Sequence, residues 1–352
     1  MARYLQKPLN SPSAWHGREL AGRDDWILSL ERNHVKELET ALAAVVERGL
    51  DPVKITAADF PLPTLSSLCR QMRSELEGGR GFVVLRALPV QHFAAADIAR
   101  MFWGLGTHLG SAEPQDGAGN LLHHVRDTGM DLDKHDVRAY QTNRAIGYHN
   151  DGADVFLLLC VQAAQHGGRT RLVSSAAVFN EILARRADLA RILQEPFYFD
   201  ARGQQAPGRP PYQLVPIFNF HAGYLNVLYK REYIDLALRF PQVPALSEQQ
   251  IEALDLLDEV CDELALEFEV RPGEILIVNN YDLLHARSAY RDQGPGAQKR
   301  HMLRLWVSIP NGRPLPPVFA TTREFCHSFA RRQASLNQTL EKLELQVSKP
   351  LR

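Results

Sequence analysis

The chain has 352 residues, of which 45% are hydrophobic and 23% are charged, and its formal net charge is -1. This composition is typical of a globular protein with a sizeable core, and a near-zero net charge does not favour binding to nucleic acid or to an anionic membrane surface. Because no apolar run approaches the roughly 20 residues of a membrane helix, and the N-terminus has no long apolar stretch, we expect neither a membrane span nor a signal peptide.

The first 110 residues are predicted to be mainly helical. Between residues 24 and 49, Val35, Leu38, Leu42 and Val45 recur at intervals of three and four, and the glycine at position 49 is a typical helix end. A second helix is predicted over residues 63–76, and a third over 93–105. Between these two helices, the apolar run at 81–86 predicts a short buried strand.

From about residue 135 onward, short apolar strands dominate. Strands are predicted at 154–161, 167–174, 266–270, 274–280 and 300–309. Two helices interrupt them, at 176–185 and 246–264, the second with Ile251, Leu254, Leu257, Cys261 and Leu264 facing inward. Short strands separated by turns favour a mainly β fold, a barrel or a sandwich, with the N-terminal helices packed outside it.

We expect a single domain over residues 1–352. Its predicted parts are an N-terminal helical extension (1–78), a core (79–310) with an insertion at about 195–264, and a C-terminal tail (311–352) on the surface. No change in composition marks a second domain.

His149 and Asp151 stand two residues apart, immediately before the apolar run at 154–161. Residues i and i+2 of an extended segment face the same side, so both side chains can point inward from one strand end. A later apolar strand leads into a loop that carries His285. Two histidines and one carboxylate form the facial triad of non-haem Fe(II) oxygenases, which leaves positions open for a co-substrate and O₂. Alone, the first pair could equally be a polar turn that caps a core strand.

Arg300 and Arg304 are four residues apart on the last predicted strand, so they share a face about 13 Å apart. Buried arginines require an anion to pair with, and a dicarboxylate co-substrate would supply one. Thr170, which follows a glycine pair at the start of another strand, is a further candidate for the same site.

Five segments together resemble the TauD/TfdA family of Fe(II)- and 2-oxoglutarate-dependent dioxygenases. They are GRGFVVLRALPV, YQTNRAIGYHNDGADV, GGRTRLVS, NNYDLLHARSAY and RHMLRLWVSIPNGRPLPP, between about residues 79 and 317. The resemblance implies a double-stranded β-helix (jelly roll) and iron held by His149, Asp151 and His285. It also implies 2-oxoglutarate held by Thr170 and Arg300, with Arg304 on the inner carboxylate or the substrate. The order of Arg300 and Arg304 stays open, because the loop that separates them from His285 is long for the family.

Other polar residues have less support. Asn143, six residues before His149, could contact the substrate or serve a turn. His123 and His124 are expected at the surface or in a lid, and Arg287 in a structural ion pair. The N-terminal 75 residues and the aromatic-rich segment at 195–239 are expected to shape the substrate pocket.

The sequence therefore predicts an oxygenase that uses Fe(II), 2-oxoglutarate and O₂ to oxidise a C–H bond of a small substrate, with release of succinate and CO₂. An anionic carboxylic or amino acid would give Arg304 a partner. Three alternatives stay open: a zinc or manganese enzyme of the cupin type, a ligand-binding barrel without turnover, and a protein-modifying oxygenase. Four scattered cysteines without a CxxC pair favour reduced thiols and a cytoplasmic location, and a homo-oligomer stays open.

Overall fold

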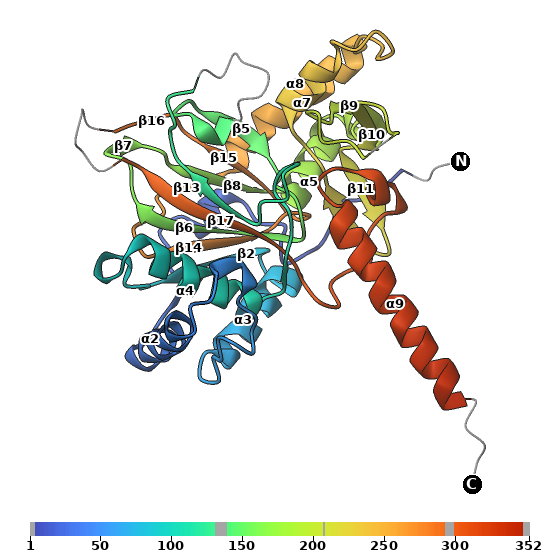
Figure 1. The fold of residues 1–352 in the computed structure, drawn as a ribbon. Coiled ribbons are helices and arrows are strands. Elements are labelled where there is room, and N and C mark those ends of the chain that lie inside the picture. Colours follow the sequence, from blue (N-terminus) through green and yellow to red (C-terminus); the bar gives the residue numbers. More distant parts are fainter. Residues whose placement is uncertain (1–3, 131–138, 207, 293–298, 348–352) are drawn as a thin grey trace.

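The computed structural model describes residues 4–130, 139–206, 208–292 and 299–347. Its centre is two facing β-sheets (Figure 1). The large sheet runs in the order β1-β2-β14-β6-β17-β3, with β4 also paired to β17. Its strands are β1 (Ile27–Ser29), β2 (Phe82–Arg86), β3 (Ser111–Ala112), β4 (Leu122–Val125), β6 (Val155–Gln162), β14 (Ile275–Asn279) and β17 (His301–Ser308).

The small sheet runs in the order β13-β8-β15-β5. Its strands are β13 (Leu266–Phe268), β8 (Thr170–Ser174), β15 (Leu283–Arg287) and β5 (Ile146–His149), all paired antiparallel. Three short pairs lie beside the two sheets: β7 (His166–Gly167) with β16 (Tyr290–Arg291), β9 (Pro196–Asp200) with β10 (Tyr212–Pro216), and β11 (Phe218–His221) with β12 (Tyr224–Val227). The two facing sheets are the core of a double-stranded β-helix.

Alternation along β17 shows how the sheets create an interior. Met302 and Trp306 belong to the apolar cluster between the sheets, whereas Leu303 and Leu305 pack against the helical layer on the other side. Successive strand residues point to opposite faces. Arg304 therefore points into the space between the sheets, with the same parity as Met302 and Trp306.

Helices cover the outer face of each sheet (Figure 1). α2 (Arg32–Glu47), α3 (Ser66–Gly78) and α4 (Ala95–Thr107) pack on the large sheet, and α5 (Ser175–Arg185), α6 (Ala187–Ile192) and α8 (Glu248–Leu264) pack on the small one. α8 begins with a capping box, in which Ser247 accepts from the Gln250 backbone and the Gln250 side chain accepts from Ser247. The remaining helical elements are α1 (Gly17–Leu20), η1 (Pro52–Lys54), η2 (Val90–His92), η3 (Ala139–Gln141), α7 (Arg231–Ala237), η4 (Pro317–Thr321) and α9 (Cys326–Val347).

Most predicted elements are confirmed to within a few residues, and the N-terminal helices do lie outside the sheets. Five expectations were wrong. His285 lies within the strand β15 rather than in a loop, and His123 is buried in β4 rather than at the surface. The segment predicted as helix from residue 24 contains the strand β1 before α2 begins at Arg32. Ile251 is 42% exposed rather than inward. The tail after Pro310 is not confined to the surface, because Phe319, Glu324 and Phe325 are buried.

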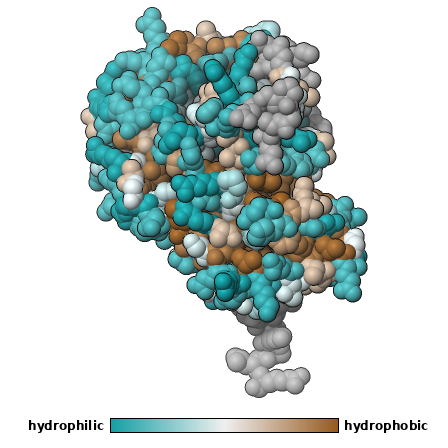
Figure 2. Space-filling model, turned by 90° about the vertical axis from the view of Figure 1, so that its left-hand side faces the viewer, coloured by the Kyte–Doolittle hydropathy of each residue, from teal (hydrophilic) through white to brown (hydrophobic). Residues whose placement is uncertain are grey.

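The described part of the chain has no helix that is long and apolar enough to cross a membrane. The face drawn in Figure 2 is mainly hydrophilic, with hydrophobic side chains visible between the polar ones. Figure 1 shows α9 extending away from the body of the molecule.

Candidate active site

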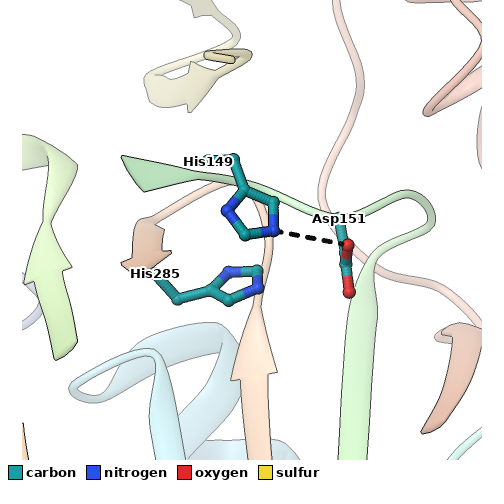
Figure 3. Close-up of side chains that lie close together, drawn as sticks. All are labelled: His149, Asp151 and His285. Atoms are coloured by element: carbon teal, nitrogen blue, oxygen red, sulfur yellow. Dashed lines mark ion pairs between the residues drawn. The ribbon is translucent and has the colours of Figure 1, made fainter. Parts of the chain in front are cut away.

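His149 and His285 lie directly opposite each other on paired strands. His149 ends β5, His285 is in the middle of β15, and the two are partners in the antiparallel register. Their ring centroids are 4.1 Å apart. Asp151 follows β5 by two residues, and its carboxylate turns back towards the rings (Figure 3). One ligand atom from each of the three side chains lies within 4.8 Å of the others.

The hydrogen bonds of His149 determine which of its nitrogens can bind a metal. Its Nδ1 donates to the Gly147 carbonyl at 2.9 Å, so Nε2, which lies 3.9 Å from Asp151 Oδ1, is left without the proton. Burial lowers the pKa of His149 to about 4. Burial, and after it the nearness of His149, also holds the pKa of His285 well below its ordinary value. Both imidazoles are therefore neutral near pH 7, as metal ligands must be.

Asp151 is buried and is held by Arg304. The Arg304 Nη1 lies 3.0 Å from Asp151 Oδ2 and 3.2 Å from Oδ1, and Arg304 Nε donates to Gln115 Oε1 at 2.8 Å. Burial alone would raise the pKa of Asp151, but Arg304 and the two histidines hold it well below its ordinary value. Two neutral imidazoles and one ionised carboxylate on one side of a cavity fit an Fe(II) ion with open positions.

The triad opens into a cavity of about 520 Å³, a size suited to small ligands. Of the residues that the structure describes, none before Gln115 lines it. The expectation that the N-terminal 75 residues shape this pocket was therefore wrong, since those residues form the helical layer and the edge of the large sheet. The segment at 195–239 does contribute, through residues 202–204 and 230–233.

Two arginines of the cavity lack partners for buried nitrogens. Within the described part of the chain, Arg287 Nε and Nη1 and Arg300 Nη1 are buried without a hydrogen bond. Both guanidinium groups lie against the ring of Tyr290, at 4.8 and 5.1 Å from its centroid. Burial lowers the pKa of Arg300, and burial followed by the charge of Arg300 lowers the pKa of Arg287 to about 10. An anion placed between them would relieve both costs.

Thr170 is buried at the start of β8 and lies opposite Arg287 of β15 in the register. Thr170, Arg287 and Arg300 all line the cavity that the triad opens into. The structure thus brings together every predicted site residue except Asn143. Asn143 is exposed and is not a lining residue, and its backbone carbonyl accepts a hydrogen bond from the Tyr290 amide.

Sequence reasoning did not name five of the seven cations of the cavity wall as site residues: Arg202, Lys230, Arg231, Arg287 and Arg323. Arg287 was assigned to a structural ion pair, but the described residues give it none; instead Nη2 donates to the Thr142 carbonyl at 3.0 Å. Its position two residues after His285 was a usable signal, because i and i+2 share a strand face. Lys230 and Arg323 also line the cavity, and no local pattern in the sequence marks them.

Comparison with known proteins gives a consistent picture. The family model described as "Taurine catabolism dioxygenase TauD, TfdA family" matches residues 47–306. FR-33289 synthase of Streptomyces rubellomurinus is 30% identical over 334 residues, which cover 92% of this chain and 97% of the relative. The taurine hydroxylase-like protein SAT17 of Stachybotrys chartarum is 29% identical, over 86% of this chain and 80% of the relative.

Solved structures share the fold at lower identity. An asparagine oxygenase in complex with Fe(II), 2S,3S-3-hydroxyasparagine and succinate matches with a TM-score of 0.63 and 17% identity, over 80% of this chain and 93% of that one. The non-haem iron oxygenase OrfP, in complex with Fe and alpha-ketoglutaric acid, matches with a TM-score of 0.60 and 15% identity over the same shares.

Proposed function

The chain belongs to the TauD/TfdA family of dioxygenases, and from this premise we propose that His149, Asp151 and His285 hold its iron and that its substrate is a small organic acid. As a member of this family it is an Fe(II)- and 2-oxoglutarate-dependent dioxygenase, which couples oxidation of a small substrate to release of succinate and CO₂. The observation that carries the residue assignment is the cluster of three ligand atoms within 4.8 Å at the wall of a cavity.

The roles of the three ligands follow from their surroundings. Iron, when bound, supplies the activation of O₂. His149 would bind through Nε2, because Nδ1 is committed to Gly147. The Asp151 carboxylate would stay ionised and oriented, because Arg304 donates to both of its oxygens. A ligand fixed by an outer hydrogen bond loses little orientational freedom when the metal binds.

For 2-oxoglutarate, we propose that Arg300, Arg287 and Thr170 hold the carboxylate remote from the iron. The buried unpartnered nitrogens of the two arginines support this assignment. Arg304 is engaged with Asp151 and Gln115, which favours Arg300 over Arg304 as the residue that binds the remote carboxylate. A guanidinium fork and a second cation around one carboxylate match the strong charge-assisted bonds that arginine forms with such groups.

The substrate class is supported by the cavity and by the relatives. Seven of the lining residues are arginine or lysine, and three are aspartate or glutamate. Among relatives and neighbours, one is a uridine-5'-phosphate dioxygenase and one an asparagine oxygenase, both named for small polar molecules. An anionic carboxylic or amino acid, or another small acid, fits a cavity of this charge.

The test is a turnover assay with Fe(II), 2-oxoglutarate and O₂ over a panel of small acids, with succinate and oxidised product measured together. The proposal predicts that at least one acid raises succinate release and is itself oxidised. Succinate release that no acid stimulates, while a neutral compound does, would contradict the proposed substrate class.

Free cysteines, three of them buried, support the further proposal of a cytoplasmic location.

A further inference from the structure

A second group of cations lies in the cavity wall, separate from Arg287 and Arg300. Lys230 precedes α7, Arg323 follows η4, and Arg202 lies in the turn between β9 and β10. All three line the cavity, and their side chains are only 8–9% exposed. The three surround the ring of Tyr233, with Lys230 Nζ 5.0 Å, Arg202 5.5 Å and Arg323 5.9 Å from its centroid.

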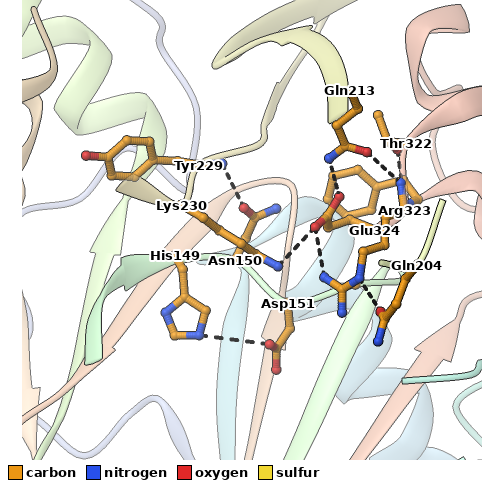
Figure 4. A network of polar contacts seen from close by, with 12 residues as sticks. His149, Asn150, Asp151, Gln204, Gln213, Tyr229, Lys230, Thr322, Arg323 and Glu324 are labelled. Carbon is orange, nitrogen blue, oxygen red and sulfur yellow. Dashed lines mark hydrogen bonds and ion pairs between the residues drawn. The ribbon is translucent and has the colours of Figure 1, made fainter. Parts of the chain in front are cut away.

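This group lies beside the metal ligands. Lys230 forms an isolated antiparallel bridge with His149. Directly opposite residues of such a pair carry their side chains on the same face, with Cβ atoms about 5 Å apart. In Figure 4 the Lys230 ammonium and the Arg323 guanidinium both approach the same oxygen of the Glu324 carboxylate, and Asp151 lies below them. A ligand held here would present its nearby carbons to the iron site.

The charges in this wall do not balance. Glu324 is buried and its Oε1 accepts from Lys230 Nζ at 3.2 Å and from Arg323 Nη1 at 3.1 Å, while Oε2 accepts from Gln213 at 2.7 Å. One carboxylate thus faces two buried cations. Arg202 has its own carboxylate, Glu232, at 3.3 Å. Lys230 and Arg323 therefore bring one positive charge more than Glu324 compensates, and such a charge in a buried wall favours the arrival of an anion.

Other anions of the cavity are already assigned. Asp151 is paired with Arg304, and 2-oxoglutarate is accounted for by Arg287 and Arg300. We propose that Lys230 and Arg323 form an oxyanion subsite for the substrate, with Arg202 at its rim, so that the substrate is a small acid held by its acidic group with the reacting carbon towards His149 and His285. This inference rests on the proposed function and names the part of the cavity that selects the substrate.

The test uses a matched series of small molecules: 3-aminopropionate, 2-aminoethanesulfonate, 2-aminoethylphosphonate and, without an acidic group, ethylamine. Binding is measured by calorimetry under anaerobic conditions, on the Fe(II)-loaded protein saturated with 2-oxoglutarate. Saturation fills the Arg287–Arg300 end, so an added oxyanion reports on the second group. We expect at least one of the three acids to bind and ethylamine not to bind, and the order of the acids identifies the head group as carboxylate, sulfonate or phosphonate.

Three variants separate a binding role from a structural one. Lys230→Met and Arg323→Gln should each weaken oxyanion binding by tenfold or more, since each removes a charge-assisted hydrogen bond. Glu324→Gln should tighten it, because it removes the carboxylate that competes for the same two cations. Arg191→Gln, an exposed arginine outside the cavity, is the control. A merely structural cluster would lose binding in all three variants.

Each single variant leaves the other residues of the cluster in place, so Glu324 keeps one cation in Lys230→Met and in Arg323→Gln. Thermal unfolding is the measurement that checks whether each variant is folded. The proposal is overturned if no acid binds the wild type better than ethylamine, or if Lys230→Met and Arg323→Gln bind the acids as the wild type does. Failure of the proposed function is separately visible, because wild-type protein would then not convert 2-oxoglutarate to succinate under air.

Discussion

Arg304 donates to both carboxylate oxygens of Asp151, at 3.0 and 3.2 Å, so the second arginine of the last strand supports the candidate iron site directly. The same guanidinium also donates from its Nε to Gln115 Oε1 at 2.8 Å, which fixes its orientation. The sequence suggested that Arg304 contacts the inner carboxylate of 2-oxoglutarate or the substrate. The geometry adds a role for Arg304 in holding Asp151, a proposed metal ligand.

We predict that Arg304→Gln weakens Fe(II) binding by about 10–100-fold, because outer hydrogen bonds to a metal ligand have effects of that size. Arg304→Lys should lose less, since it keeps the charge but only part of the hydrogen-bonding geometry. Calorimetric titration with Fe(II) under anaerobic conditions measures both. Arg126→Gln, an exposed arginine outside the cavity, is the control, and an unchanged dissociation constant in Arg304→Gln would show that Asp151 does not depend on Arg304.

Arg300→Ala and Arg287→Gln should each raise the KM for 2-oxoglutarate by tenfold to over a hundredfold. The reason is the loss of a charge-assisted hydrogen bond, which is worth roughly 1.5–3 kcal/mol. Initial rates of succinate formation over a range of 2-oxoglutarate concentrations give the result, with exposed Arg291→Gln as the control. If Arg304→Gln raises this KM and Arg300→Ala does not, Arg304 rather than Arg300 binds the remote carboxylate of 2-oxoglutarate.

Glu324 should make the folded state sensitive to acid. Burial would raise the pKa of Glu324, but Lys230 and Arg323 lower it to about 2, against an ordinary value of 4.5. A carboxyl with a lowered pKa contributes stability that is present above pH 4.5 and is lost as the pH falls towards 2. The difference corresponds to roughly 3 kcal/mol.

Urea unfolding of wild type and Glu324→Gln checks this dependence. The wild type should be more stable by about 3 kcal/mol at pH 7, and the gap should narrow steadily between pH 4.5 and pH 3. A gap that stays constant over this range would mean that the Glu324 charge does not contribute.

The sequence predicted the long central strands because they depend on local signals, and the structure places the three predicted ligands close together. β6 and β14 are continuous apolar runs, as central strands are, and His149 and Asp151 are adjacent to one of them. β1 was missed because three residues carry too little periodicity, and it is stabilised by a parallel pairing with β2 far along the chain. Ile251 lies in the first turn of α8, and the buried residues of this helix begin only at Ala253.

The second cation group could not be predicted from the sequence. Lys230 and Arg323 are 93 residues apart, and only the return of the tail after η4 brings Arg323 and Glu324 to the cavity. A Pro-rich segment followed by basic residues reads as surface, whereas Phe319 and Phe325 anchor it in the core against Tyr281. The spacing of His149 and Asp151 is visible in the sequence, whereas the group formed by Lys230 and Arg323 is assembled only by tertiary packing.

Fe(II)-dependent conversion of 2-oxoglutarate to succinate by wild type and by His149→Ala, Asp151→Ala and His285→Ala tests the central claim most directly. The account predicts that the wild type forms succinate only when Fe(II), 2-oxoglutarate and O₂ are all present. Each of the three variants should stay folded and form none, while His301→Ala, outside the cavity, should keep wild-type activity. Wild-type rates in any one of the three, or turnover that zinc supports as well as iron, would contradict the iron site.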